Sequence, residues 1–129
     1  MIDWQNLNKV KLASSDESMD KHDIVKLLLV RMLLRKHKHE KNYIRIYTEF
    51  KINKDKICDI YFENIKKKET YIFEIQKKIT NEWIKETREA YKKELEMQIV
   101  MTTDLIIVDL NKLSDDLNKL KEQLEVYIV

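Results

Sequence analysis

The spacing of apolar residues along this chain changes several times, and each change predicts the end of one element and the start of the next. Apolar residues over a wide arc predict a first helix at residues 19–38 that should be largely buried, with a sheet as the obvious partner. Alternation then predicts a strand at residues 42–52. Turns at residues 53–56 and 64–69 lead to two further strands, so a meander forms. One face of the first strand should carry Ile44, Ile46, Thr48 and Phe50.

Helical spacing returns after the third strand. Thr80 or Asn81 can cap a helix that runs to about residue 99, and the compact apolar run at residues 104–110 is of the buried-strand type. Ser114 is expected to cap a last helix, in which leucines recur at three- and four-residue steps. The predicted order is therefore α, β, β, β, α, β, α. We expect the last helix to pack against the sheet, and a dimer seam along its leucines is the alternative.

Length and composition exclude several classes of protein. The 129 residues predict one domain, which we place at residues 19–129 after an N-terminal arm at residues 1–18. Glycine and proline are absent, which excludes Gly-rich phosphate loops and the nucleotide cofactors they bind. Cys58 is the only cysteine, so a disulfide within the chain and a thiolate zinc cluster are both excluded. The apolar stretch at residues 24–34 is too short to span a membrane, so we expect a cytoplasmic protein.

Two acids stand inside the predicted second and third strands. Asp59 lies early in the second strand on the face of Tyr61, opposite Cys58 and Ile60, and Glu74 lies near the end of the third. One face of the third strand carries Tyr71, Phe73 and Ile75, and the other carries Ile72, Glu74 and Gln76. A plausible hairpin register sets the two acids side by side, where each raises the other's pKa unless a cation lies between them. Such oxygen ligands suit Mg²⁺ or Mn²⁺. The alternative is a pair of solvated acids on an exposed sheet face.

With this order of elements, the sequence resembles the PD-(D/E)xK nuclease superfamily, which includes archaeal Holliday junction resolvases, many restriction enzymes and small nucleases of archaeal viruses. The resemblance covers roughly residues 19–125 and rests on Glu49, Asp59 and the run EIQK at residues 74–77. It implies an α/β fold with a restriction-endonuclease-like αβββαβ(α) core, a central mixed sheet flanked by helices. It also implies a Mg²⁺-dependent deoxyribonuclease acting inside a cell, on branched or flapped DNA among other substrates, and in a host cell if the protein is viral.

The resemblance also implies roles for individual residues. In the family an Asp and a Glu hold one or two divalent metal ions, so Asp59 and Glu74 would bind Mg²⁺ or Mn²⁺ with help from the backbone carbonyl of Ile75. Glu49 would be the further acid that often assists upstream in the family. The alternatives for that role are Glu17 and Asp23, near the first helix.

Gln76 stands where the family has the lysine that orients or activates the attacking water. Glutamine can position water but supplies no positive charge, so Lys77, Lys78 or Lys85 would have to supply it. Lys77 points to the opposite face of a regular strand, and it could serve only if the strand ends or bulges there. The implied catalytic set is Asp59, Glu74, Gln76 and Lys77.

DNA is the implied partner, although the formal net charge of +2 does not by itself indicate a nucleic-acid binder. It would approach through basic groups around the site: Lys66, Lys67, Lys68, Lys78, Lys85, Arg88, Lys92 and Lys93. Contacts of this kind to phosphate give affinity that falls steeply with salt. Two other functions are open: an inactive nuclease-fold module that binds DNA or protein, and a small interaction protein that forms a homodimer through its last helix.

Overall fold

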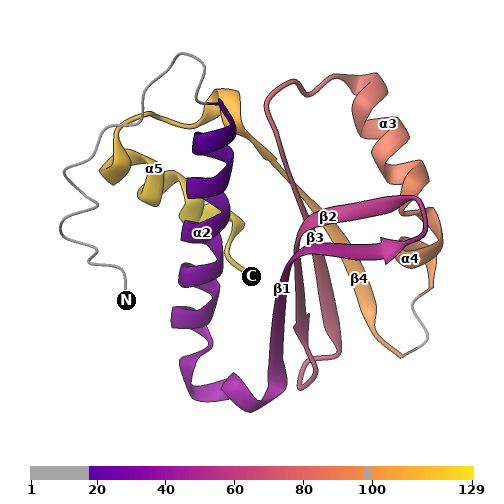
Figure 1. Ribbon diagram of the computed structural model, residues 1–129. Coiled ribbons are helices and arrows are strands. Elements are labelled where there is room, and N and C mark those ends of the chain that lie inside the picture. The colour runs from indigo at the N-terminus through magenta and orange to yellow at the C-terminus, as the bar shows by residue number, and fades with distance from the viewer. Residues whose placement is uncertain (1–17, 98–99) are drawn as a thin grey trace.

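The computed structural model describes residues 18–97 and 100–129, which form a four-stranded sheet with helices on both faces (Figure 1). The helices are α2 (Ser18–Lys36), α3 (Asn81–Ala90), α4 (Lys92–Glu96) and α5 (Leu117–Leu124). The strands are β1 (Ile44–Asn53), β2 (Lys56–Asn64), β3 (Glu69–Gln76) and β4 (Thr102–Asp109). Short 3-10 turns are η1 (Lys38–Tyr43), η2 (Leu110–Lys112) and η3 (Glu125–Tyr127). The predicted order of elements is confirmed.

Two predicted helices have different limits in the structure. The helix expected to run to about residue 99 is interrupted at Tyr91, which separates α3 from α4. The last helix begins at Leu117 rather than after Ser114, because the side chain of Asp116 caps it by accepting a hydrogen bond from the backbone N–H of Asn118 at 3.0 Å. The predicted N-terminal arm lies outside the described residues except for Ser18, the first residue of α2.

The sheet is open and mixed, with the strand order β1-β2-β3-β4. β1 pairs with β2 and β2 pairs with β3 in antiparallel fashion, whereas β3 and β4 are parallel. Parallel neighbours need a crossover connection, and α3 and α4 supply it. The crossover covers one face of the sheet, while α2 and α5 cover the other (Figure 1).

The main core lies between the sheet and the pair α2 and α5. Its fully buried side chains include Leu28 and Leu33 of α2 and Phe62 and Phe73 of the strands. The three leucines of α5 are buried in the same core: Leu117, Leu120 and Leu124. Packing within the chain therefore accounts for their spacing, as predicted. The burial of α2 is less complete than expected, since Leu27 is 40% and Leu34 is 41% exposed.

A second, smaller cluster occupies the opposite face of the sheet. Cys58, Ile72 and Tyr91 are fully buried there, against partly buried apolar side chains of β1 and α4. Burial raises the pKa of the Cys58 thiol to about 12, so at neutral pH it remains an uncharged thiol. The cluster attaches the helix crossover to the part of the sheet that carries the two acids.

The hairpin of β1 and β2 bends sharply near its middle (Figure 1). Glu49 lies at the bend with φ at 49°, in the left-handed region that non-glycine residues rarely adopt. Ile46 packs into the main core before it, whereas Phe50 packs into the second cluster after it. The prediction that even-numbered residues of β1 share one face is therefore wrong, because the left-handed residue turns the strand over. β2 changes face in the same place, since Ile60 lies in the main core and Cys58 in the second cluster.

Candidate functional site

The bend opens a pocket of about 570 Å³ where the two predicted metal ligands meet. The walls come from the first turns of α2, from β1, β2 and β3, and from α3. The lining residues are His22, Asp23, Lys26, Glu49, Lys56, Asp59, Glu74, Ile75, Gln76 and Trp83. The structure therefore brings together the four acids Asp23, Glu49, Asp59 and Glu74, together with Ile75 and Gln76.

The predicted hairpin register is the one observed. The ladder between β2 and β3 ends with Ile60 opposite Phe73, and its continuation sets Asp59 opposite Glu74. The ladder stops there because β2 turns over at the bend, and Asp59 uses its side chain in place of a backbone pair. Its Oδ2 accepts a hydrogen bond from the backbone N–H of Ile75 at 2.6 Å.

Asp59 is held from two sides in a largely buried position. Besides the Ile75 N–H on Oδ2, its Oδ1 lies 3.1 Å from Nε2 of His22 on α2. The two side chains are 15% and 16% exposed, respectively. Burial raises the pKa of Asp59 and the charge of Glu49 raises it further, although the Ile75 N–H and His22 act in the opposite direction.

Glu74 is more deeply buried, at 7% exposure. The hydroxyl of Tyr91 donates a hydrogen bond to its Oε1, and Tyr91 occupies the break between α3 and α4. Burial raises the pKa of Glu74, as do the negative charges of Asp59 and Glu49, whereas Tyr91 and the nearby Lys56 lower it. Both central acids therefore have raised pKa values, and burial is the largest cause for each.

Two lysines of the pocket were missed by sequence reasoning. Nζ of Lys26, on α2, lies 2.9 Å from Oε1 of Glu49 and 3.7 Å from Oδ1 of Asp23. Burial lowers the pKa of Lys26, but Glu49, Asp23 and Asp59 together raise it by more. Lys56, at the start of β2, places its Nζ 5.8 Å from the centre of the Tyr91 ring. Among the described residues, Lys56 has no carboxylate within ion-pair distance.

His22 and Tyr91 were also missed, and only His22 left a weak signal. His22 and Lys26 are four positions apart near the start of α2, a spacing that places both on one face of the helix. Tyr91 gave no signal of its own, because its place at a helix break follows from the packing of the crossover.

The predicted lysines near the end of β3 do not line this pocket. Lys77 and Lys78 are exposed beyond Gln76, and the backbone carbonyl of Lys77 accepts a hydrogen bond from Asn111. Lys85 lies on α3, where it lines a different hollow. Of the alternatives for the upstream acid, Asp23 lines the pocket, and Glu17 lies outside the described residues.

The hairpin lysines are not around the site, and the expectation that they are is wrong. Lys66, Lys67 and Lys68 occupy the turn that follows β2, whereas Asp59 lies near its start. Five residues of strand from Asp59 to Asn64 span about 16 Å at about 3.3 Å per residue. The lysines lie at the turn that closes the hairpin of β2 and β3, whereas Asp59 lies toward its open end. Lys66 is paired instead with Glu40 of η1, at 3.4 Å.

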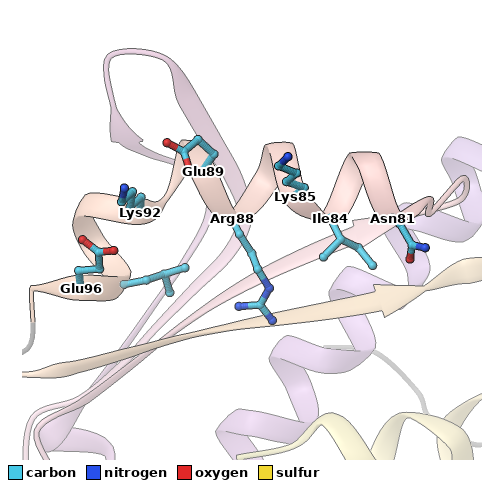
Figure 2. Close-up of a pocket in the computed structure, with 8 residues that line it drawn as sticks. Asn81, Ile84, Lys85, Arg88, Glu89, Lys92 and Glu96 are labelled. Carbon is cyan, nitrogen blue, oxygen red and sulfur yellow. The ribbon is translucent and has the colours of Figure 1, made fainter.

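The remaining predicted DNA contacts lie on the helix crossover. Lys85, Arg88 and Lys92 line a shallow hollow of about 520 Å³ along α3 and α4 (Figure 2). Figure 2 shows Lys85 and Lys92 on one side of these helices and Arg88 on the other. Glu89 and Glu96 line the same hollow, so its charge is mixed. Lys93 lies nearer the turn between β1 and β2. The structure thus spreads the basic residues over several surfaces, and DNA binding by them stays a prediction.

The donor set of the pocket fits a hard divalent cation. Within residues 18–97 and 100–129, no group of three or more His, Cys, Asp or Glu side chains is arranged as a metal site. Mg²⁺ needs fewer, since it is commonly held by one or two carboxylates and completes its shell with water and substrate phosphate. Asp59 and Glu74 are two such carboxylates, and Ile75 lines the same pocket.

Comparisons of the chain with models of known protein families, with curated proteins and with solved structures found no match. In the part of the chain that the structure describes, none of the helices has the length and apolar character needed to cross a membrane.

Proposed function

We propose that this chain is a metal-dependent endonuclease of the PD-(D/E)xK type that hydrolyses phosphodiester bonds in DNA. One observation supports it most: Asp59 and Glu74, two largely buried acids that the register of neighbouring strands sets opposite each other, line a pocket that also contains Gln76. Keeping two acids in such a place costs stability, because burial raises the pKa of each and the charge of Asp59 raises that of Glu74 further. A bound cation would offset this cost, because its positive charge stabilises both carboxylates.

Asp59, Glu74 and the backbone carbonyl of Ile75 would hold Mg²⁺ or Mn²⁺. When bound, the ion would lower the pKa of a coordinated water and stabilise the negative charge that develops on the phosphate. Tyr91 keeps the carboxylate of Glu74 in place, since its hydroxyl donates a hydrogen bond to Oε1. Gln76 offers both an amide N–H and a carbonyl oxygen, with which it orients a water molecule without changing its charge.

The positive charge that Gln76 lacks comes from Lys26 and Lys56 in this proposal. Both line the pocket, and both act electrostatically on its acids, Lys26 on Asp59 and Lys56 on Glu74. They replace Lys77, which lies outside the pocket, in the expected role. A phosphate that enters the pocket meets these ammonium groups, which offset its charge beside the carboxylates.

A nuclease-like module without catalytic activity is the second candidate. Gln76 favours it, because the position lacks the charge that the family uses there. The hydrogen bonds of Asp59 also favour it, since both oxygens already have partners within the protein. This candidate predicts salt-sensitive binding to DNA, or binding to a protein, without metal-dependent cleavage. A dimeric interaction protein has less support, because the leucines of α5 that suggested it are buried in the core.

Cleavage of labelled linear, flapped and four-way DNA over a titration of Mg²⁺ and Mn²⁺ tests the proposal. The wild type is compared with Asp59→Ala and with Asp104→Ala, a matched control at an exposed acid of β4 that does not line the pocket. We expect cleavage that Asp59→Ala abolishes and Asp104→Ala retains. Binding without cleavage in either metal would support the inactive module, and equal cleavage by wild type and Asp59→Ala would contradict both the site and the proposal.

A further inference from the structure

His22 makes a contact that the proposed chemistry does not yet use. Its Nε2 lies 3.1 Å from Oδ1 of Asp59, while the Ile75 N–H holds Oδ2 at 2.6 Å. The two groups come from α2 and β3, so the carboxylate on β2 is fixed between a helix and the neighbouring strand. An ionised carboxylate only accepts hydrogen bonds, so Nε2 of His22 must carry the proton in this contact when Asp59 is ionised.

The second ring nitrogen of His22, Nδ1, bears on why the ring lies in this place. Nδ1 is buried and has no hydrogen-bond partner, and the nearest acid oxygen, Oδ1 of Asp23, lies 3.6 Å away. A buried polar atom without a partner costs free energy, which an apolar residue at this position would avoid. The ring is therefore placed for its contact with Asp59, and ordinary core packing does not account for it.

We infer that His22 is a positioning residue, which orients the carboxylate of Asp59 toward Glu74 through the hydrogen bond from Nε2. The inference rests on the proposed function. Without His22, Oδ1 of Asp59 loses its only partner among the described residues, and the carboxylate is left with the Ile75 N–H alone. Groups that orient metal ligands in this way change metal affinity or activity by about 10–100-fold when they are removed.

The test compares His22→Ala with His22→Gln, whose amide N–H can occupy the place of Nε2. His39→Ala is the matched control, because His39 is exposed on η1. Mn²⁺ affinity is measured by calorimetry, and kcat and KM are measured for DNA cleavage. We expect His22→Ala to bind Mn²⁺ about 10–100-fold more weakly and to lose kcat with little change in KM, whereas His22→Gln restores most of both.

Several outcomes would overturn the inference. Wild-type Mn²⁺ affinity in His22→Ala, in a protein whose cleavage depends on Asp59, would refute the role of His22 and leave the proposed function intact. No Mn²⁺ binding and no cleavage by the wild type would refute both. If thermal unfolding shows that His22→Ala is not folded, His22→Leu takes its place, and equal Mn²⁺ affinities of His22→Leu and His22→Gln would refute the inference.

Discussion

The left-handed backbone at Glu49 produces the bend that forms the pocket, and glycine substitution tests it. Residues other than glycine rarely adopt a φ such as the 49° found here, because the Cβ atom approaches the following carbonyl. In an ordinary strand, alanine is more favourable than glycine. At Glu49 we expect the reverse, so that Glu49→Gly is more stable than Glu49→Ala.

The expected difference follows from two opposing terms. The left-handed conformation costs a non-glycine residue about 1–2 kcal/mol, which glycine avoids. Glycine offsets about 0.4–1 kcal/mol of that gain, because it has greater conformational freedom to lose from the unfolded chain. We therefore expect Glu49→Gly to exceed Glu49→Ala in free energy of unfolding by about 0.5–1 kcal/mol. Both variants lose the ion pair with Lys26, in which Glu49 is 58% exposed, so that loss cancels in the comparison.

Urea unfolding measures this difference directly. A gain of about 0.5–1 kcal/mol moves the midpoint by about 0.3–0.7 M at the denaturant sensitivity usual for small domains. Thr48 provides the matched control, since it is an exposed neighbour in β1 whose φ is not positive. Thr48→Ala should be more stable than Thr48→Gly. If Glu49→Ala is also more stable than Glu49→Gly, the backbone at Glu49 is not left-handed, and this explanation of the bend fails.

Three further predictions concern the acids, the lysines and the core. Without metal, Asp59→Asn should be more stable than the wild type at neutral pH, because the raised pKa of Asp59 makes its ionised form costly in the folded state. This gain in stability should shrink as the pH falls through the pKa of Asp59 in the folded state. A difference in thermal unfolding that does not change with pH would contradict this prediction. Lys56→Met should slow cleavage by about 10²-fold or more, whereas Lys77→Met should not, and equal kcat values would exclude Lys56 from the role. Leu120→Ala should lower the free energy of unfolding by about 2–5 kcal/mol, because Leu120 is fully buried, and a loss below about 1 kcal/mol would place it outside the core.

Sequence reasoning located the acid pair because the pairing of β2 with β3 is a local matter. Alternation in the third strand assigns Phe73 to one face and Glu74 to the other, and a one-residue slip would have moved the main-core residues of that strand to the opposite face. The apolar pattern therefore predicts the register, and this register sets Asp59 opposite Glu74.

The rest of the pocket depends on tertiary packing, which a local pattern does not encode. His22 and Lys26 reach the acids only because α2 lies across the sheet, and Tyr91 reaches Glu74 only because the crossover breaks there. The positive φ of Glu49 left no mark in the sequence, because the position carries neither glycine nor asparagine, the residues that most often adopt it. The wrong placement of the lysines at residues 66–68 could have been avoided from the sequence. The antiparallel pairing of β2 and β3 already puts the turn between them far from Asp59.

We propose that Asp59 and Glu74 together form one divalent-metal site. Calorimetric titration of Mn²⁺ into the wild type, Asp59→Asn and Glu74→Gln tests it most directly, because both substitutions keep the size of the side chain while removing its charge. We predict a single site in the wild type that is lost in both variants, with Glu49→Gln affected less because its carboxylate is already paired with Lys26. Equal Mn²⁺ binding by the wild type and the two variants, or no binding by any of them, would contradict the account.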